Sequence, residues 1–175
     1  MDIYRSCCSF TGHRPHKFPW KYNEADSRCV ALKAALTEQI KALVEAGVTD
    51  FFSGGADGVD CWAVWIVLEL KKTNPALKLH MILPHEGQAD KWSDSAQERY
   101  HSIVSQANTV EYVSREYYDG CMLDRNHRLV EAADLLLAVY NGERCGGTAA
   151  TVRYARKLRR KLIILNPTSL EAVRE

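Results

Sequence analysis

The regular alternation of short apolar runs with longer segments of helical periodicity is the feature that most constrains how this sequence can fold. The apolar runs are nearly continuous in Val, Ile, Leu and Phe, which is typical of strands buried on both faces of a parallel sheet. The intervening segments repeat their apolar residues at the spacing of an α-helix. The pattern therefore predicts an α/β fold with a doubly wound, mainly parallel sheet and helices on both faces.

Caps, glycines and prolines set the expected boundaries of these elements. Asn23, Asp26 and Ser27 are caps for a long first helix, which we expect to end at Ala46 because Gly47 follows. The other helices are expected over about 59–72, 91–107, 124–133 and 148–160. The strands are expected over 5–11, 48–53, 78–83, 109–113, 135–140 and 162–165. No repeat or low-complexity linker interrupts the pattern, so we expect one domain over residues 1–175.

Composition narrows the class of protein and its partners. Apolar residues make up 46% of the chain and charged residues 26%, which is an ordinary globular balance. The formal net charge of +1 gives no overall attraction to nucleic acid or to an anionic membrane. No apolar run is long enough to cross a bilayer, and the first residues do not form a secretion signal. We therefore expect a cytoplasmic protein without a membrane partner.

Cysteine and histidine patterns indicate neither a disulfide framework nor a metal centre. The six cysteines form no CxxC pair, so we interpret them as reduced packing residues. Cys145 differs from the others because it adjoins a glycine turn. The six histidines include the close pair His13 and His16, but no ligand pattern such as HExxH is present. We expect no metal site.

Ligands of doubly wound sheets bind beyond the carboxyl ends of the strands, and this directs attention to the turn after the first strand. It contains Thr11, Gly12, His13 and Arg14. The glycine allows close approach to the backbone, and an arginine can hold phosphate through two parallel hydrogen bonds. We predict that these residues contact an anionic ligand; the alternative is a solvated loop.

The second turn follows the strand predicted over 48–53 and reads SGGADGVD over residues 53–60. Its glycines are typical of a turn that exposes amide groups at a helix N-terminus, where anions bind. Its predicted ligand-binding residues are Ser53, Gly54, Gly55, Ala56, Asp57 and Asp60. The two carboxylates would repel phosphate, so they cap the helix or bind ribose hydroxyls instead. The spacing is neither GxGxxG nor a Walker A loop, and the alternative is a simple tight turn.

The third turn, at residues 145–150, joins the most apolar strand to a helix. Gly146, Gly147 and Thr148 would present backbone amides and a hydroxyl group at the helix start. Two such turns in one sheet would make a pair of anion sites, as a nucleotide or dinucleotide requires.

These motifs resemble those of known families. The pattern SG-A-GVD at residues 53–60, followed by RN-RL at 125–129 and GTA at 147–149, resembles DNA-processing protein A. The pattern formed by Met122, Arg125 and the glycine turn at 146–148 resembles that of the LOG (lysine-decarboxylase-like) proteins. The closest resemblance is to the YpsA-like group, with its TGHRP start and SGGADG turn, and it covers about residues 9–167.

The resemblance implies a Rossmann-like fold with a pocket for a nucleotide or an ADP-ribose-like ligand. It adds Arg125 and Asn126 to the predicted binding residues. One position departs from the LOG pattern, because Thr151 stands where those enzymes carry a catalytic glutamate. Without that carboxylate, phosphoribohydrolase activity is not expected on this ground.

Three functions remain open from the sequence. The first is binding or sensing of a nucleotide derivative. The second is hydrolysis of an N-glycosidic or phosphate bond, with Asp57, Asp60 or Glu86 as the acid or base. The third is DNA binding through the basic residues of the last helix, at 153–161, for which the alternative is a solvated helix face.

The helix expected over 59–72 is apolar almost all the way round, whereas a surface helix of a monomer usually has one polar face. We therefore expect its second face, including Trp65, to be buried in a homo-oligomer such as a dimer.

Overall fold

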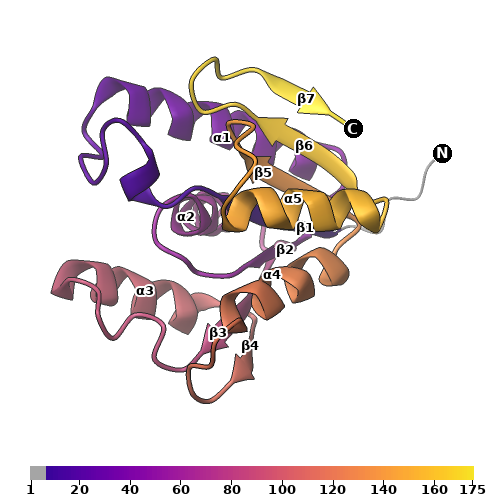
Figure 1. The fold of residues 1–175 in the computed structure, drawn as a ribbon. Helices are drawn as coiled ribbons and strands as arrows, with labels where there is room; N and C mark the ends of the chain where they lie inside the picture. Colours follow the sequence, from indigo (N-terminus) through magenta and orange to yellow (C-terminus); the bar gives the residue numbers. More distant parts are fainter. Residues whose placement is uncertain (1–6) are drawn as a thin grey trace.

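The computed structural model describes residues 7–175, so residues 5 and 6 of the first expected strand lie outside the described residues. Strands and helices alternate along the chain, as Figure 1 shows. The elements are β1 (Cys7–Gly12), η1 (Pro15–Lys17), α1 (Ser27–Glu45), β2 (Asp50–Ser53), α2 (Val59–Lys71), β3 (Lys78–His85), α3 (Asp94–Gln106), β4 (Thr109–Ser114), α4 (Cys121–Ala132), β5 (Leu135–Val139), α5 (Gly147–Lys157), β6 (Lys161–Leu165) and β7 (Ala172–Arg174).

The strands form a single sheet in the order β4-β3-β2-β1-β5-β6-β7. All neighbouring strands are parallel except β6 and β7, which are antiparallel. From β1 the chain first builds outward through β2, β3 and β4, then returns to the other side of β1 with β5. The direction of winding therefore changes between β1 and β5, and this is the switch point at which such sheets bind ligands.

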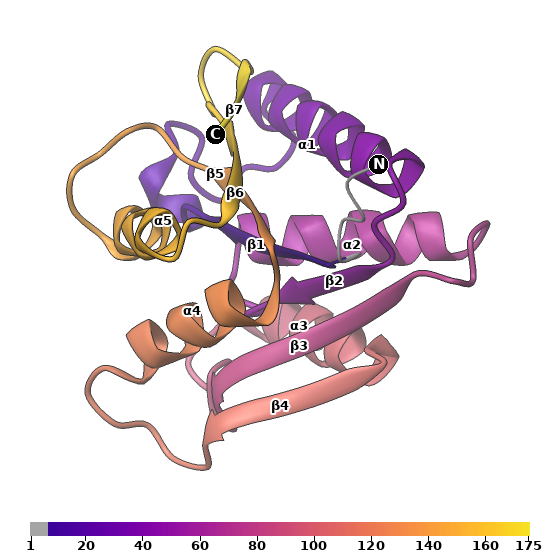
Figure 2. The ribbon, with the colours of Figure 1, turned by 90° about the vertical axis from the view of Figure 1, so that its right-hand side faces the viewer.

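Helices cover both faces of the sheet. In Figure 2, α1, α2 and α3 lie on one face and α4 and α5 on the other. Phe10 and Phe51 are completely or almost completely buried under the first group of helices, and Leu136 of β5 packs with Val152 of α5 on the other face. This confirms the predicted Rossmann-like α/β fold.

Local sequence explains most element boundaries. The carboxylate of Asp26 accepts a hydrogen bond from the amide of Arg28 and caps α1, as expected. The start of α3 is later than expected because the hydroxyl of Ser93 caps it by accepting from the amide of Ala96. α4 begins at Cys121, three residues earlier than 124, since the left-handed Gly120 lets the chain enter the helix there.

Two expected boundaries are corrected. Pro84 does not end the third strand, because β3 continues to His85 and its pairing with β4 skips the proline. The last helix ends at Lys157 rather than at Arg160, because Arg159 adopts a positive φ of 54°. The short strand β7 has too little apolar pattern to have been expected.

Most of the apolar circumference of α2 is buried within this chain. Figure 1 shows α2 between α1 and α3, with the sheet beneath it. Trp62, Val64 and Val67 are consequently buried within this chain. Trp65, at 38% exposure, is the large apolar side chain of α2 that remains exposed. Burial within the molecule thus accounts for most of the apolar pattern, while a homo-oligomer that covers the exposed Trp65 stays a prediction.

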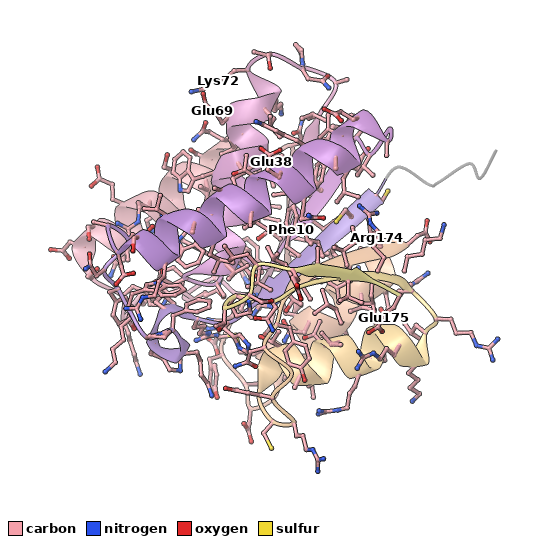
Figure 3. All side chains as sticks on the ribbon, turned by 90° about the horizontal axis from the view of Figure 1, so that it is seen from above. Phe10, Glu38, Glu69, Lys72, Arg174 and Glu175 are labelled. Atoms are coloured by element: carbon pink, nitrogen blue, oxygen red, sulfur yellow. The ribbon has the colours of Figure 1, made fainter. Side chains whose placement is uncertain are left out.

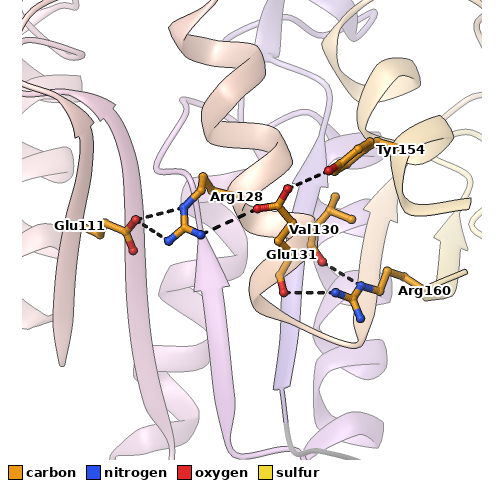
Figure 4. A network of polar contacts seen from close by, with 6 residues as sticks. All are labelled: Glu111, Arg128, Val130, Glu131, Tyr154 and Arg160. Carbon is orange, nitrogen blue, oxygen red and sulfur yellow. Dashed lines mark hydrogen bonds and ion pairs between the residues drawn. The ribbon is translucent and has the colours of Figure 1, made fainter. Parts of the chain in front are cut away.

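Ion pairs and hydrogen bonds fasten α4 to its neighbours, as Figure 4 shows. Arg128 binds Glu111 on β4 at 2.7 Å and Glu131 at 3.8 Å. Glu131 in turn accepts a hydrogen bond from the hydroxyl of Tyr154 on α5. These partners are about half exposed, so each contact stabilises the fold only weakly, by about 0–1 kcal/mol. Together they connect α4 to β4 and to α5.

The end of the chain is attached to α5. Figure 3 shows Glu175 beside this helix, where Arg156 donates two hydrogen bonds to its carboxylate at 2.7 and 2.8 Å. Across residues 7–175, no helix has both the length and the apolar character needed to cross a membrane. The same residues contain no group of three or more His, Cys, Asp and Glu side chains that could hold a metal ion.

Candidate functional site

The three turns identified in the sequence meet at one cavity of about 320 Å³. The cavity lies beyond the carboxyl ends of β1, β2 and β5, at the switch point of the sheet, and α4 closes another side. Its walls comprise Thr11, Gly12, His13, Arg14, His16, Lys17, Ala56, Asp60, Met122, Arg125, Asn126, Glu143, Cys145, Gly146, Gly147 and Thr148. We call it the phosphate cavity, after the ligand group expected there.

Glycines let the first and second turns pack directly against each other. A Cβ at Gly12 would lie 2.5 Å from a methyl carbon of Val59, and a Cβ at Gly58 would lie 2.8 Å from Cδ of Pro15. Gly58 also has a φ of +94°, which side chains rarely adopt. The TGHRP and SGGADGVD motifs are therefore two halves of one packed unit.

Three amides of the second turn are not free for a ligand. The amide of Gly55 donates to Ser53 Oγ, that of Ala56 to Asp60 Oδ2, and that of Gly58 to Asp57. Because these three groups are already hydrogen-bonded inside the protein, they do not contribute to the second amide site expected from the sequence.

Arg125 is the central cation of the site and is only 3% exposed. Its Nη1 donates to the carbonyl of Gly54 at 2.5 Å and to Gln88 Oε1 at 3.3 Å, while Nε donates to Asn126 Oδ1 at 2.8 Å. A Cβ at Gly54 would lie 2.4 Å from Nη1, so this glycine is needed to admit the guanidinium. Gly54 thus contacts Arg125 but does not line the cavity itself.

Asp60 lies in the wall of the same cavity and is 6% exposed. Burial raises the pKa of its carboxyl group, while the nearby charges of Arg125 and Arg14 act in the opposite direction. Burial also lowers the pKa of Arg125. Among residues 7–175, no ion pair within 4.0 Å joins Asp60 to either arginine, so the buried cation has no direct carboxylate partner.

The third turn has the open geometry that the sequence predicts. Gly146 has a φ of 99° and precedes α5, whose N-terminus has no side-chain cap. The structure, over its described residues, shows no acceptor for the amides of Gly147, Thr148 and Ala149. Gly147 and Thr148 line the cavity, and Asn126 lies close to Gly147. A helix N-terminus with free amides therefore faces a cavity that also contains Arg125 and Arg14.

His13 is a wall of the cavity and is held in one protonation state. Its Nε2 accepts a hydrogen bond from the amide of Asn141 at 3.3 Å, so the hydrogen of the neutral ring is on Nδ1. Burial lowers the pKa of His13, although Glu143 acts in the opposite direction. The ring is therefore neutral at physiological pH.

The remaining predicted residues are separated from the cavity to different extents. Ser53, Gly54 and Gly55 are buried and are not among its walls. Asp57 lines a neighbouring groove, and Glu86 is exposed, 3.8 Å from Arg115. Of the three acid or base candidates, Asp60 alone lines the phosphate cavity.

Sequence reasoning missed several residues of the cavity wall. Lys17 and Glu143 form an ion pair of 3.5 Å across its rim, and His16 and Met122 also line it. Met122 belongs to the LOG-like pattern and His16 to the histidine pair seen in the sequence, but neither was predicted to bind a ligand. No motif marks Lys17 in η1 or Glu143 in the loop before the third turn. Cys145 is exposed and lines the cavity, as its place beside the glycine turn suggested.

The basic residues of the last helix are partly used within the protein. Arg156 binds Glu175, and Arg160 lies 3.4 Å from Asp134 and donates to the carbonyls of Val130 and Glu131 at the end of α4. These contacts satisfy orphan carbonyls and neutralise charge, which is the structural interpretation of the basic run.

Comparison with known proteins agrees with this arrangement. The YpsA family model, described as the YspA SLOG family, matches residues 8–165. The chain is 28% identical to a UPF0398 protein of Halalkalibacterium halodurans, covering 93% of this chain and 89% of the relative. It is 30% identical to a UPF0398 protein of Shouchella clausii, covering 92% and 87%.

The fold also resembles a solved structure of DNA processing protein A from Helicobacter pylori, which was described for its single-stranded DNA binding mode. The TM-score is 0.61 at 19% identity, over 91% of this chain but 65% of that one. The chain thus spans somewhat less than two thirds of this structural relative, and the likeness shows a shared fold.

Proposed function

We propose that this chain, which belongs to the YspA SLOG family, binds a phosphate-bearing nucleotide derivative in the phosphate cavity. The observation that carries the proposal is that the uncapped N-terminus of α5 opens into the same cavity as Arg125 and Arg14. Free amides at a helix N-terminus and guanidinium groups both commonly hold phosphate in proteins.

Electrostatics favours an anionic ligand at this place. The cations Arg14, Lys17 and Arg125 line the cavity together with the anions Asp60 and Glu143. Glu143 is already paired with Lys17, and the pKa of Asp60 is raised by burial, so the cavity has a net demand for negative charge. A phosphate would give the buried Arg125 the partner that it lacks, and each charge-assisted hydrogen bond contributes about 1.5–3 kcal/mol.

Ligand binding can be tested by thermal unfolding and calorimetry with AMP, ADP and ADP-ribose. Binding to the folded state alone stabilises it by about 2.7 kcal/mol at a ligand concentration of 100 times Kd. Arg14→Gln removes an exposed cation of the cavity without disturbing the core, so it should abolish most of the stabilisation. Lys157→Gln, an exposed change of equal charge outside the cavity, is the matched control.

The proposal fails if none of these ligands raises the unfolding temperature. It fails equally if Arg14→Gln and Lys157→Gln bind the same ligand with the affinity of the wild type.

Hydrolysis of the ligand is the second candidate, and the position of Asp60 favours it. A buried carboxyl group with a raised pKa is suited to general acid catalysis. Thr151 does not replace the missing glutamate, since it is buried and its hydroxyl donates to the carbonyl of Gly147. Mass spectrometry of a bound nucleotide after long incubation decides between binding and hydrolysis. Hydrolysis would be established if the wild type releases base or phosphate and Asp60→Asn does not.

DNA binding rests on the fold shared with DNA processing protein A. The internal contacts of Arg156 and Arg160 leave less free positive charge on α5 for a phosphate backbone. Oligonucleotide binding that weakens steeply with salt, and that Lys157→Gln reduces, would favour this function instead.

A further inference from the structure

A second cavity, of about 370 Å³, adjoins the phosphate cavity and differs from it in character. His13 and Lys17 line both cavities. The other walls are mainly apolar and come from the loop after β1, from α1 and from the loops after β5 and β6. Their polar members are Arg28, Asn141 and Thr168. We name it the Trp20 cavity, and its apolar walls include Phe18, Trp20, Ala31, Pro167 and Leu170.

The aromatic residues of this cavity form a rigid floor. Phe18 and Trp20 are stacked at 4.7 Å with their rings nearly parallel, and Phe18 also stacks on Trp62 of α2. All three side chains are buried. Rigid apolar walls favour a flat, uncharged group and disfavour a phosphate, which would lose its hydration there.

His13 lies at the boundary between the two cavities and has a free donor. It is 6% exposed, and Asn141 occupies its Nε2. Its Nδ1–H has no acceptor among the described residues, and Nδ1 is not one of their buried unpartnered atoms, so it remains accessible from the cavities. A ligand atom can therefore accept a hydrogen bond from Nδ1 in place of water. The side chain that separates the cavities can therefore bind a group that passes between them.

We propose that the base of the nucleotide ligand occupies the Trp20 cavity while its phosphate is held in the phosphate cavity. This inference rests on the proposed function, and it defines the ligand class as a nucleotide whose sugar lies across His13 and Lys17. Two observations support this inference. The two cavities share side chains, and the walls change from mainly charged and polar in the phosphate cavity to mainly apolar in the Trp20 cavity.

A third cavity, which shares Arg14 and His16 with the phosphate cavity, is a less suitable place for the base. It is larger, at about 570 Å³, and is lined by Glu24, Asp57, Lys91 and Arg99 as well as Trp92. Charged side chains must be desolvated when an uncharged base covers them, and the Trp20 cavity has fewer of these, namely Lys17 and Arg28.

Filling the Trp20 cavity tests the inference. Ala31→Leu adds apolar volume from α1 without contacting the phosphate cavity, and leucine is compatible with a helix. Ala34→Leu, at an exposed position of the same helix, is the matched control. Affinities are measured by calorimetry for the ribonucleoside 5′-monophosphates and for ribose 5-phosphate, which has the phosphate and sugar but no base.

The wild type should bind at least one nucleoside monophosphate about tenfold or more tightly than ribose 5-phosphate, since burial and stacking of a base contribute that order of affinity. Ala31→Leu should remove this difference and leave ribose 5-phosphate within about twofold of the wild type, while Ala34→Leu changes neither.

The inference is overturned if Ala31→Leu leaves the preference for the nucleotide intact, or if it weakens both ligands equally. It is also overturned if the wild type binds both ligands alike, although the phosphate site then stands. A wild type that binds neither ligand would contradict the proposed function itself.

Discussion

Replacing Gly54 with alanine tests how the Arg125 guanidinium is held in the site. The new Cβ would lie 2.4 Å from Nη1, 2.7 Å from Cζ and 2.8 Å from Cδ of Arg125. Arg125 cannot move away without cost, because Nη1 is bonded to the Gly54 carbonyl and to Gln88. We expect the substitution to destabilise the fold by forcing this side chain out of place.

The expected size follows from two opposing effects. Overpacking of a close-packed site costs about 1–3 kcal/mol. Alanine also restricts the unfolded chain, which stabilises the protein by about 0.4–1 kcal/mol where its backbone conformation is allowed. Gly54 does not have a positive φ, so this gain applies. The free energy of unfolding should therefore fall by about 1–2 kcal/mol in Gly54→Ala.

Urea denaturation of a double-mutant cycle measures the clash directly. In an Arg125→Ala background the obstructing side chain is absent, so Gly54→Ala should become neutral or stabilising. Gly147→Ala is a suitable control, since its Cβ would meet only Asn126 Nδ2, at 3.8 Å. An equal loss of stability from Gly54→Ala in both backgrounds would refute the packing argument.

Three further outcomes are expected. Gly58→Ala should lower the free energy of unfolding by about 2 kcal/mol or more, because the new side chain meets Pro15 in a left-handed backbone conformation; urea denaturation will show a smaller loss if the turns adjust. Burial lowers the pKa of His13 below its usual value of 6.5. The stability that the neutral ring contributes is therefore complete above pH 6.5 and is lost as the pH falls toward the lower folded-state pKa. Unfolding midpoints measured down to about pH 5 should decline less in His13→Gln than in the wild type. Iodoacetamide should react fastest with Cys145, which is exposed, and bound nucleotide should slow that reaction; peptide mass spectrometry with unchanged labelling would argue against a ligand beside this thiol.

The positions of the turns could be predicted from the sequence, but the direction of their amides could not. Parallel strands end at one edge of a sheet, so the alternating pattern alone indicates that residues 12–14, 56–60 and 146–148 meet there. Whether an amide is free depends on side chains that return to it. Ser53, Asp57 and Asp60 accept hydrogen bonds from three amides of the second turn, and nothing in local spacing distinguishes this from an open anion site.

Burial that arises from tertiary packing was similarly hidden in the sequence. An apolar helix has the same appearance whether a second molecule or a neighbouring helix covers it. For α2, the neighbours α1 and α3 cover most of the helix while Trp65 stays exposed. The Trp20 cavity was not predicted either, since its walls bring Ala31 and Leu170 together from distant parts of the chain.

The mutual insertion of the first two turns has a consequence for protein engineering. Val59 occupies the space that a side chain at Gly12 would need, and Pro15 does the same for Gly58. A designer who transplants the SGGADG segment into another sheet must therefore transfer TGHRP with it, as a matched pair. Random mutagenesis should likewise recover changes at these positions mainly as compensating doubles, in which a bulkier residue on one side accompanies a smaller one on the other.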